Sequence, residues 1–165
     1  MVQNVEIFIG IAHIAGIFVG FEALISVTHR KEVGRIRSVV TIGLMVIIAS
    51  LLPIGFDSYG ISGHYLWFWC SLIFFILNLV ISILSLRNPD NRVALKSQMR
   101  SNPFMTILFF LLFEIPLQVP LILAILGLFP DLEYAFYLTA LLFSLFEAAF
   151  VLAQLVYVQG DQSSE

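Results

Sequence analysis

The lysines and arginines of this 165-residue chain lie in two short segments, and the sequence around these segments is strongly apolar. Four of the eight basic residues fall within positions 30–37 and the other four within positions 87–100. Hydrophobic residues make up 60% of the chain, and the mean hydropathy is +1.00. Basic loops separated by long apolar runs are typical of a polytopic membrane protein built from helices. The predicted fold class is therefore all-α.

Five apolar stretches are long enough to cross a bilayer, which takes about 20 helical residues. The predicted transmembrane helices are Val5–Thr28, Ile36–Ile54, Tyr65–Leu86, Phe104–Phe129 and Glu133–Val158. We expect the second to stop at Pro53, because proline disrupts a helix. The first lacks a basic leading region, so we interpret it as a retained span and not as a secretory signal. Residues 1–158 are expected to form one transmembrane domain, followed by a disordered acidic tail at 159–165.

The two basic segments define the predicted topology. Five crossings place both on the same side, which the positive-inside rule assigns to the cytoplasm. The N-terminus is then outside and the C-terminus inside, in a cell membrane such as a bacterial inner membrane. In the alternative topology the second stretch is re-entrant or interfacial, which leaves four crossings and puts the basic segments on opposite sides. The positive-inside rule disfavours that arrangement.

The second basic segment has a helical spacing of its own. Arg92, Lys96 and Arg100 recur every four residues and would share one face of a short helix. One interpretation is a short surface helix whose charges fix the topology. The other is that this face also binds anionic lipid headgroups. Both interpretations make the bilayer the expected partner, and nothing in the pattern indicates nucleic acid.

Ionisable groups inside the predicted spans are the main functional candidates: His13 and Glu22 in the first, Glu114 in the fourth and Glu147 in the fifth. A charged carboxylate at the bilayer centre costs at least about 2.5–3.5 kcal/mol, so these groups should face protein or water. Glu114 and Glu147 lie at similar depth, roughly 15 Å from the inner ends of two adjacent spans. Two carboxylates brought together there would share a proton or a cation.

The fourth span combines its carboxylate with other polar features. Glu114 and Gln118 are four residues apart and share a face. Pro116 and Pro120 kink the helix and leave two carbonyls without helical N–H donors. Carboxylate, amide and freed carbonyl oxygens in a broken helix resemble the cation sites of transporters. The alternative is a bent helix whose Gln118 only bonds a neighbouring helix.

Polar residues also form stripes on the third and fifth spans. The third carries Asn78 in line with Ser71, Ser82 and Ser85, and the fifth carries Ser144, Glu147 and Gln154. Such stripes can be interhelical hydrogen bonds, worth about 0.6 kcal/mol each, or parts of a hydrophilic path. The presence of Asn, Gln and Glu favours a path.

The first span has polar groups on two faces. Glu6 and His13 share one face, next to a ladder of small residues that includes Gly16 and Gly20, and Glu22 lies on the opposite face. We therefore expect this span either to be central or to meet another subunit with one face. The outer-loop residues Asp57 and His64 match no metal motif and are interpreted as loop residues.

Signatures of known chemistry are missing from the chain. There is no His-Glu-x-x-His, no Gly-x-Ser-x-Gly, no P-loop and no dinucleotide-binding motif. Enzyme activity is thus not indicated, no cofactor is expected, and any metal remains unknown.

The sequence supports one main functional hypothesis and two alternatives. The main hypothesis is a small ion or proton channel or proton-coupled carrier. We expect it to be homo-oligomeric, because several copies more easily enclose a path lined by His13, Glu22, Asn78, Glu114, Gln118 and Glu147. The first alternative is a non-transporting accessory or scaffold subunit of a membrane complex. The second is an intramembrane enzyme or metal-binding protein that uses the same acidic residues and His13.

Overall fold

The computed structural model describes residues 5–28, 33–87 and 103–162, and the side chains of some residues near the ends of these ranges lie outside the description. The described residues form five long helices and one 3-10 turn, without strands. The elements are α1 (Val5–Thr28), α2 (Val33–Ser58), α3 (His64–Arg87), α5 (Pro103–Leu126), η2 (Pro130–Leu132) and α6 (Glu133–Gln162).

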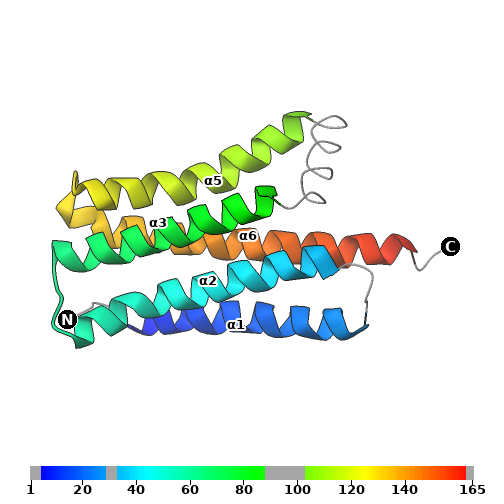
Figure 1. Ribbon diagram of the computed structural model, residues 1–165, viewed down its shortest axis with the longest axis horizontal. Coiled ribbons are helices and arrows are strands. Elements are labelled where there is room, and N and C mark those ends of the chain that lie inside the picture. Colours follow the sequence, from blue (N-terminus) through cyan, green and yellow to red (C-terminus); the bar gives the residue numbers. More distant parts are fainter. Residues whose placement is uncertain (1–4, 29–32, 88–102, 163–165) are drawn as a thin grey trace.

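The long helices lie side by side in one elongated bundle (Figure 1). α6 is the central element, because it packs against each of the other four. α1 packs mainly on α2 and also on α6, at the edge of the bundle. The prediction that the first span occupies the centre is therefore wrong, which leaves the alternative that its outer face meets another subunit. α5 and α6 pack against each other as a hairpin.

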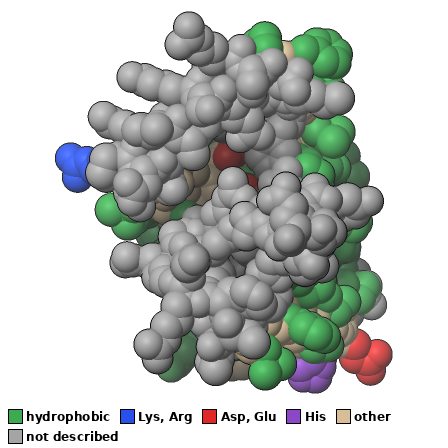
Figure 2. Space-filling model, turned by 90° about the vertical axis from the view of Figure 1, so that its right-hand side faces the viewer, with side chains coloured by type: hydrophobic (Ala, Val, Ile, Leu, Met, Phe, Trp, Pro, Cys, Tyr) green, Lys and Arg blue, Asp and Glu red, His purple; other side chains and the backbone are tan. Residues whose placement is uncertain are grey.

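Three helical segments are long and apolar enough to cross a membrane: Val40–Ser58, His64–Ser85 and Pro130–Ala153. α1 and α5 contribute the shorter apolar segments Val5–Phe21 and Leu111–Leu126. Large aliphatic side chains are exposed along the outside of these helices, and Figure 2 shows hydrophobic groups covering one flank. An all-helical bundle with apolar outer faces is the architecture expected of a helical membrane protein.

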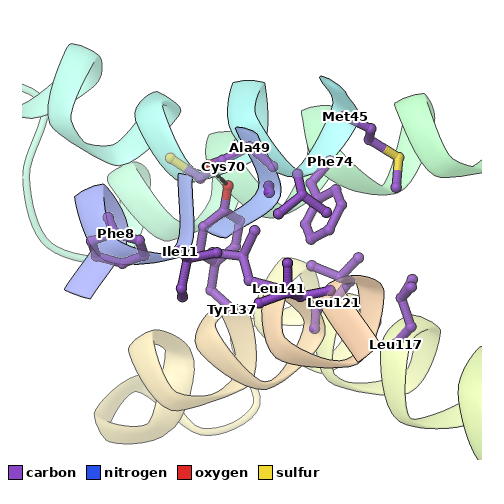
Figure 3. Packing of buried hydrophobic residues seen from close by; sticks show 14 of the residues in the cluster. Phe8, Ile11, Met45, Ala49, Cys70, Phe74, Leu117, Leu121, Tyr137 and Leu141 are labelled. Atoms are coloured by element: carbon purple, nitrogen blue, oxygen red, sulfur yellow. Dashed lines mark hydrogen bonds between the residues drawn. The ribbon is translucent and has the colours of Figure 1, made fainter. Parts of the chain in front are cut away.

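The helix α2 does not stop at Pro53, contrary to the sequence prediction, and continues to Ser58. A proline inside a helix cannot donate to the carbonyl four residues earlier, which here is that of Ala49. The hydroxyl of Tyr137 on α6 donates to this carbonyl oxygen at 2.6 Å. Figure 3 shows Tyr137 reaching from α6 toward Ala49. Another helix thus supplies the hydrogen-bond donor that the proline lacks.

Aromatic rings fill the core between α1, α3 and α6. Phe8, Trp67 and Tyr137 lie with ring centroids 5.8–6.3 Å apart. Tyr137 also meets Phe74 edge-on at 5.8 Å. Tyr137 thus belongs to the buried core and the partly buried Trp67 packs against it, whereas Tyr59 and Tyr65 are exposed.

The turn between α2 and α3 and the turn after α5 depend on glycine. Gly60 and Gly63 between α2 and α3 have φ values of 82° and 65°, and Gly127 after α5 has 63°. These left-handed conformations are costly for residues with a Cβ atom. They hold the starts of α3 and α6 close to the preceding helices.

Candidate functional site

A polar cluster lies between α3, α5 and α6, on residues that the sequence singled out. The amide nitrogen of Gln118 on α5 donates to Oδ1 of Asn78 on α3. The same nitrogen lies 3.4 Å from Oε2 of Glu114, one helical turn away. Asn78 is buried, and Gln118 and Glu114 are partly buried. The amide of Gln118 therefore links a neighbouring helix to the Glu114 carboxylate of its own helix.

Glu147 brings a second carboxylate to this cluster from α6. It is partly buried, and its carboxylate is close enough to that of Glu114 for the two charges to interact. Two such like charges repel strongly in a poorly solvated place, so a proton or cation between them is favourable. The packing of α5 on α6 thus places the two carboxylates within electrostatic reach of each other. Acidic side-chain atoms are visible inside the outline of the bundle in Figure 2.

Several buried polar atoms near these helices have no hydrogen-bond partner among the described residues. They are the carbonyl oxygen of Gln118 and the hydroxyls of Ser71 on α3 and Ser144 on α6. An unsatisfied buried polar group costs about 1–3 kcal/mol, and ordered water commonly satisfies such groups. Pro116 and Pro120 also deprive two carbonyls of α5 of their helical donors. The site is consequently rich in acceptors, which suits water, a proton or a cation.

The polar stripe of α3 extends further than the sequence analysis recognised. Ser71 and Asn78 are seven residues apart and both are buried, and His64 lies seven residues before Ser71. The interpretation of His64 as a loop residue is wrong, because it is the first residue of α3. The heptad spacing with Ser71 and Asn78 is the pattern that could have placed it on this face.

His64 pairs with Glu133, a residue that the sequence analysis did not single out. Nδ1 of His64 is in hydrogen-bond contact with Oε1 of Glu133, the first residue of α6. The side chain of His64 is 46% exposed, whereas that of Glu133 is 2% exposed. The imidazole also lies against Gly127, where an added Cβ would come within 2.8 Å of its Cε1. The pair therefore joins the starts of α3 and α6 beneath the turn that follows α5.

The other predicted site residues lie elsewhere or outside the described parts. His13 is exposed on α1 and does not join the cluster. In Figure 2 a histidine and an acidic side chain project together at the lower edge, the side on which α1 lies in Figure 1. Glu22 belongs to α1, but its side chain is outside the description, as is that of Gln154. Arg92, Lys96 and Arg100 fall within residues 88–102 and are not described.

Among the residues that the structure describes, no three His, Cys, Asp or Glu side chains are placed to hold a metal ion. Comparisons with protein-family models, with curated proteins and with solved structures found no match. The arrangement of the polar groups is therefore the basis for the functional conclusion.

Proposed function

We propose that this chain is a small transport protein of the cell membrane that conducts or carries protons or small cations. The observation that carries the proposal is the interacting pair of Glu114 and Glu147 inside a helical bundle, linked through Gln118 to Asn78. Carboxylates at membrane depth are costly unless water, a partner group, a proton or a cation compensates for their charge. Here they occur together with buried acceptors that no protein donor satisfies.

The chemistry of the cluster favours cationic cargo. Two carboxylates, an unpaired amide oxygen and two carbonyls without helical donors present negative charge or lone pairs. A proton can bind to either carboxylate or be shared between them, and a small cation can accept oxygen ligands from both helices. An anion would be repelled by the two carboxylates.

The five-span topology remains part of this proposal. The end of α1, the start of α2, the end of α3 and the start of α5 lie at one end of the bundle (Figure 1). These are the helix ends that adjoin the two basic segments, so the helix directions support a common cytoplasmic side. An N-terminal tag should then be accessible from outside in intact cells. A tag reached only after permeabilisation would contradict this topology.

The direct test replaces both central carboxylates in the full-length protein. Wild-type protein in liposomes should acidify or alkalinise the interior when a potassium gradient with valinomycin sets the membrane potential. The variant Glu114→Gln/Glu147→Gln should lower this proton flux at least tenfold, because amides cannot bind the proton. The matched control is Glu6→Gln, which removes an exposed carboxylate of α1. If the double variant transports protons like the wild type, the assignment is wrong.

Self-association is a second part of the proposal and concerns the outer face of α1. His13, Gly16 and Gly20 are exposed there, and an added Cβ on either glycine would meet nothing within 4 Å. A second copy with the same topology presents the same residues at the same depth around a two-fold axis. Two imidazoles can then hydrogen-bond to each other while the glycines allow close approach. Gly16→Leu should reduce cross-linking between His13→Cys copies, whereas Leu44→Ala on α2 should not.

The alternative function is that of a non-transporting subunit in a membrane complex. The observation that favours it is the hydrogen bond between Gln118 and Asn78, since such bonds also stabilise purely structural contacts between helices. In that case the Glu114→Gln/Glu147→Gln variant would lose assembly with its partner, and the wild type alone would show no flux. Binding of anionic headgroups by Arg92, Lys96 and Arg100 is compatible with either function.

A further inference from the structure

The carboxylate of Glu133 is buried at the outer end of α6, and its partner is a side chain that reaches the surface. Glu133 is almost fully buried, and its Oε1 is in contact with Nδ1 of His64. Nearly half of the His64 side chain is accessible, so its ring connects the buried carboxylate to the surroundings. The Gly127 turn lies against the Cε1–Nε2 edge of this ring.

Other titratable groups at this end of the bundle are arranged differently. Asp131 on η2 is exposed, as are Tyr59 and Tyr65. Asp57 lies at the end of α2 and is partly buried. Tyr134, the neighbour of Glu133, has a buried hydroxyl without a partner among the described residues. Among the contacts of Glu133, that with the imidazole of His64 joins two titratable side chains directly.

We propose that His64 and Glu133 form an outer proton-exchange site. A hydronium ion gives its proton to Nε2 of the neutral imidazole, and the proton on Nδ1 passes along the existing contact to Oε1 of Glu133. The carboxylate becomes a carboxylic acid, the imidazole stays neutral as its other tautomer, and the hydronium becomes water. The reverse sequence returns the proton. An imidazole suits this role because its two nitrogens can accept and donate at once.

This site deepens the proposed function, on which it rests for its connection to the midplane. The buried face of α6 continues from Glu133 to Ser144. On α3, the half-exposed His64 is followed at seven-residue intervals by the buried Ser71 and Asn78. The hydroxyls of Ser71 and Ser144 lack partners among the described residues and can each hold water. The exchange between water and Glu133, however, is measurable without any transport.

The test is infrared difference spectroscopy of the full-length protein in lipid, recorded between acidic and neutral pH. The wild type should show a protonated carboxyl band that disappears in Glu133→Gln and persists in the control Asp131→Asn. On transfer to D₂O, that band should shift at least tenfold more slowly in His64→Gln. Glutamine keeps an N–H donor for the carboxylate but cannot relay a proton, so a purely structural pair would show unchanged exchange.

Two results would overturn this proposal: no band that depends on Glu133 at any pH at which the protein stays folded, or equal exchange rates in wild type and His64→Gln. Should His64→Gln fail to fold, histidine ¹⁵N spectra of the wild type and Glu133→Gln decide instead. Loss of the carboxylate must then change the tautomer populations of His64, and identical spectra would reject the site. If exchange depends on His64 but Glu114→Gln/Glu147→Gln transports normally, the outer site stands and the transport assignment fails.

Discussion

Tyr137 on α6 donates a hydrogen bond to the carbonyl oxygen of Ala49 on α2, the carbonyl that Pro53 leaves without its helical donor. The side chains of Tyr137 and Ala49 are fully buried. The bond therefore compensates for the proline and connects two helices in the same place. α2 continues for five residues beyond this proline, to Ser58.

Removing this hydroxyl should destabilise the protein. Tyr137→Phe leaves the Ala49 carbonyl buried and unpaired, so we expect a loss of about 1–2 kcal/mol in the free energy of unfolding. The matched control is Tyr134→Phe, because the Tyr134 hydroxyl is buried without a partner among the described residues. That variant should be neutral or slightly stabilising. Equal effects of the two substitutions on unfolding in bicelles would contradict the role assigned to Tyr137.

Gly127 should be the turn glycine most sensitive to substitution. Gly127→Ala places a residue with a Cβ at a φ of 63° and brings this atom within 2.8 Å of the His64 ring. The left-handed backbone costs about 1–2 kcal/mol, and the close contact should add roughly 1 kcal/mol or more. Gly60→Ala, at a φ of 82° with open space around it, measures the backbone cost alone. Thermal unfolding of both variants gives the difference, and a smaller effect at Gly127 would argue against the tight packing of His64.

The bond between Asn78 and Gln118 should show energetic coupling. A double-mutant cycle with Asn78→Leu and Gln118→Leu isolates the interaction from the separate costs of each change. Buried hydrogen bonds between membrane helices average about 0.6 kcal/mol and reach about 1.7 kcal/mol. We expect a value in this range from the four unfolding free energies. Coupling near zero would mean that α3 and α5 are held together by apolar packing alone.

Gly43 should govern the distance between α1 and α2. An added Cβ would lie 2.5 Å from Cγ2 of Val19. Gly43→Ala is therefore expected to cost about 1–3 kcal/mol through overpacking, and Val19→Ala in the same chain should recover most of the loss. Gly55→Ala on α2 meets nothing within 4 Å and should be stabilising, as alanine favours a helix over glycine. A Gly43→Ala protein that is as stable as the wild type would contradict the close approach.

The helices could be predicted from the sequence because length and hydropathy determine them locally. The bounds of α1 agree with the predicted first span, and α5 carries Glu114 and Gln118 on one face as their spacing indicates. The donor to the Ala49 carbonyl, which Pro53 leaves unpaired, could not be predicted, because it is a hydroxyl 88 positions away in the sequence. His64 and Glu133 are 69 positions apart, and no local pattern signals their contact. Periodicity identifies the polar face of a helix but does not identify the helix that covers it.

The central position of α6 limits how this bundle could change shape during the proposed transport cycle. A helix that touches all four others cannot slide or turn without breaking its packing against each of them. α5 packs chiefly on two neighbours and is weakened at Pro116 and Pro120. Within the proposed function, Glu147 on α6 is therefore the stationary carboxylate and Glu114 on α5 is the one that moves. Bending of α5 would open and close the gap between them, so one flexible helix suffices as the moving part.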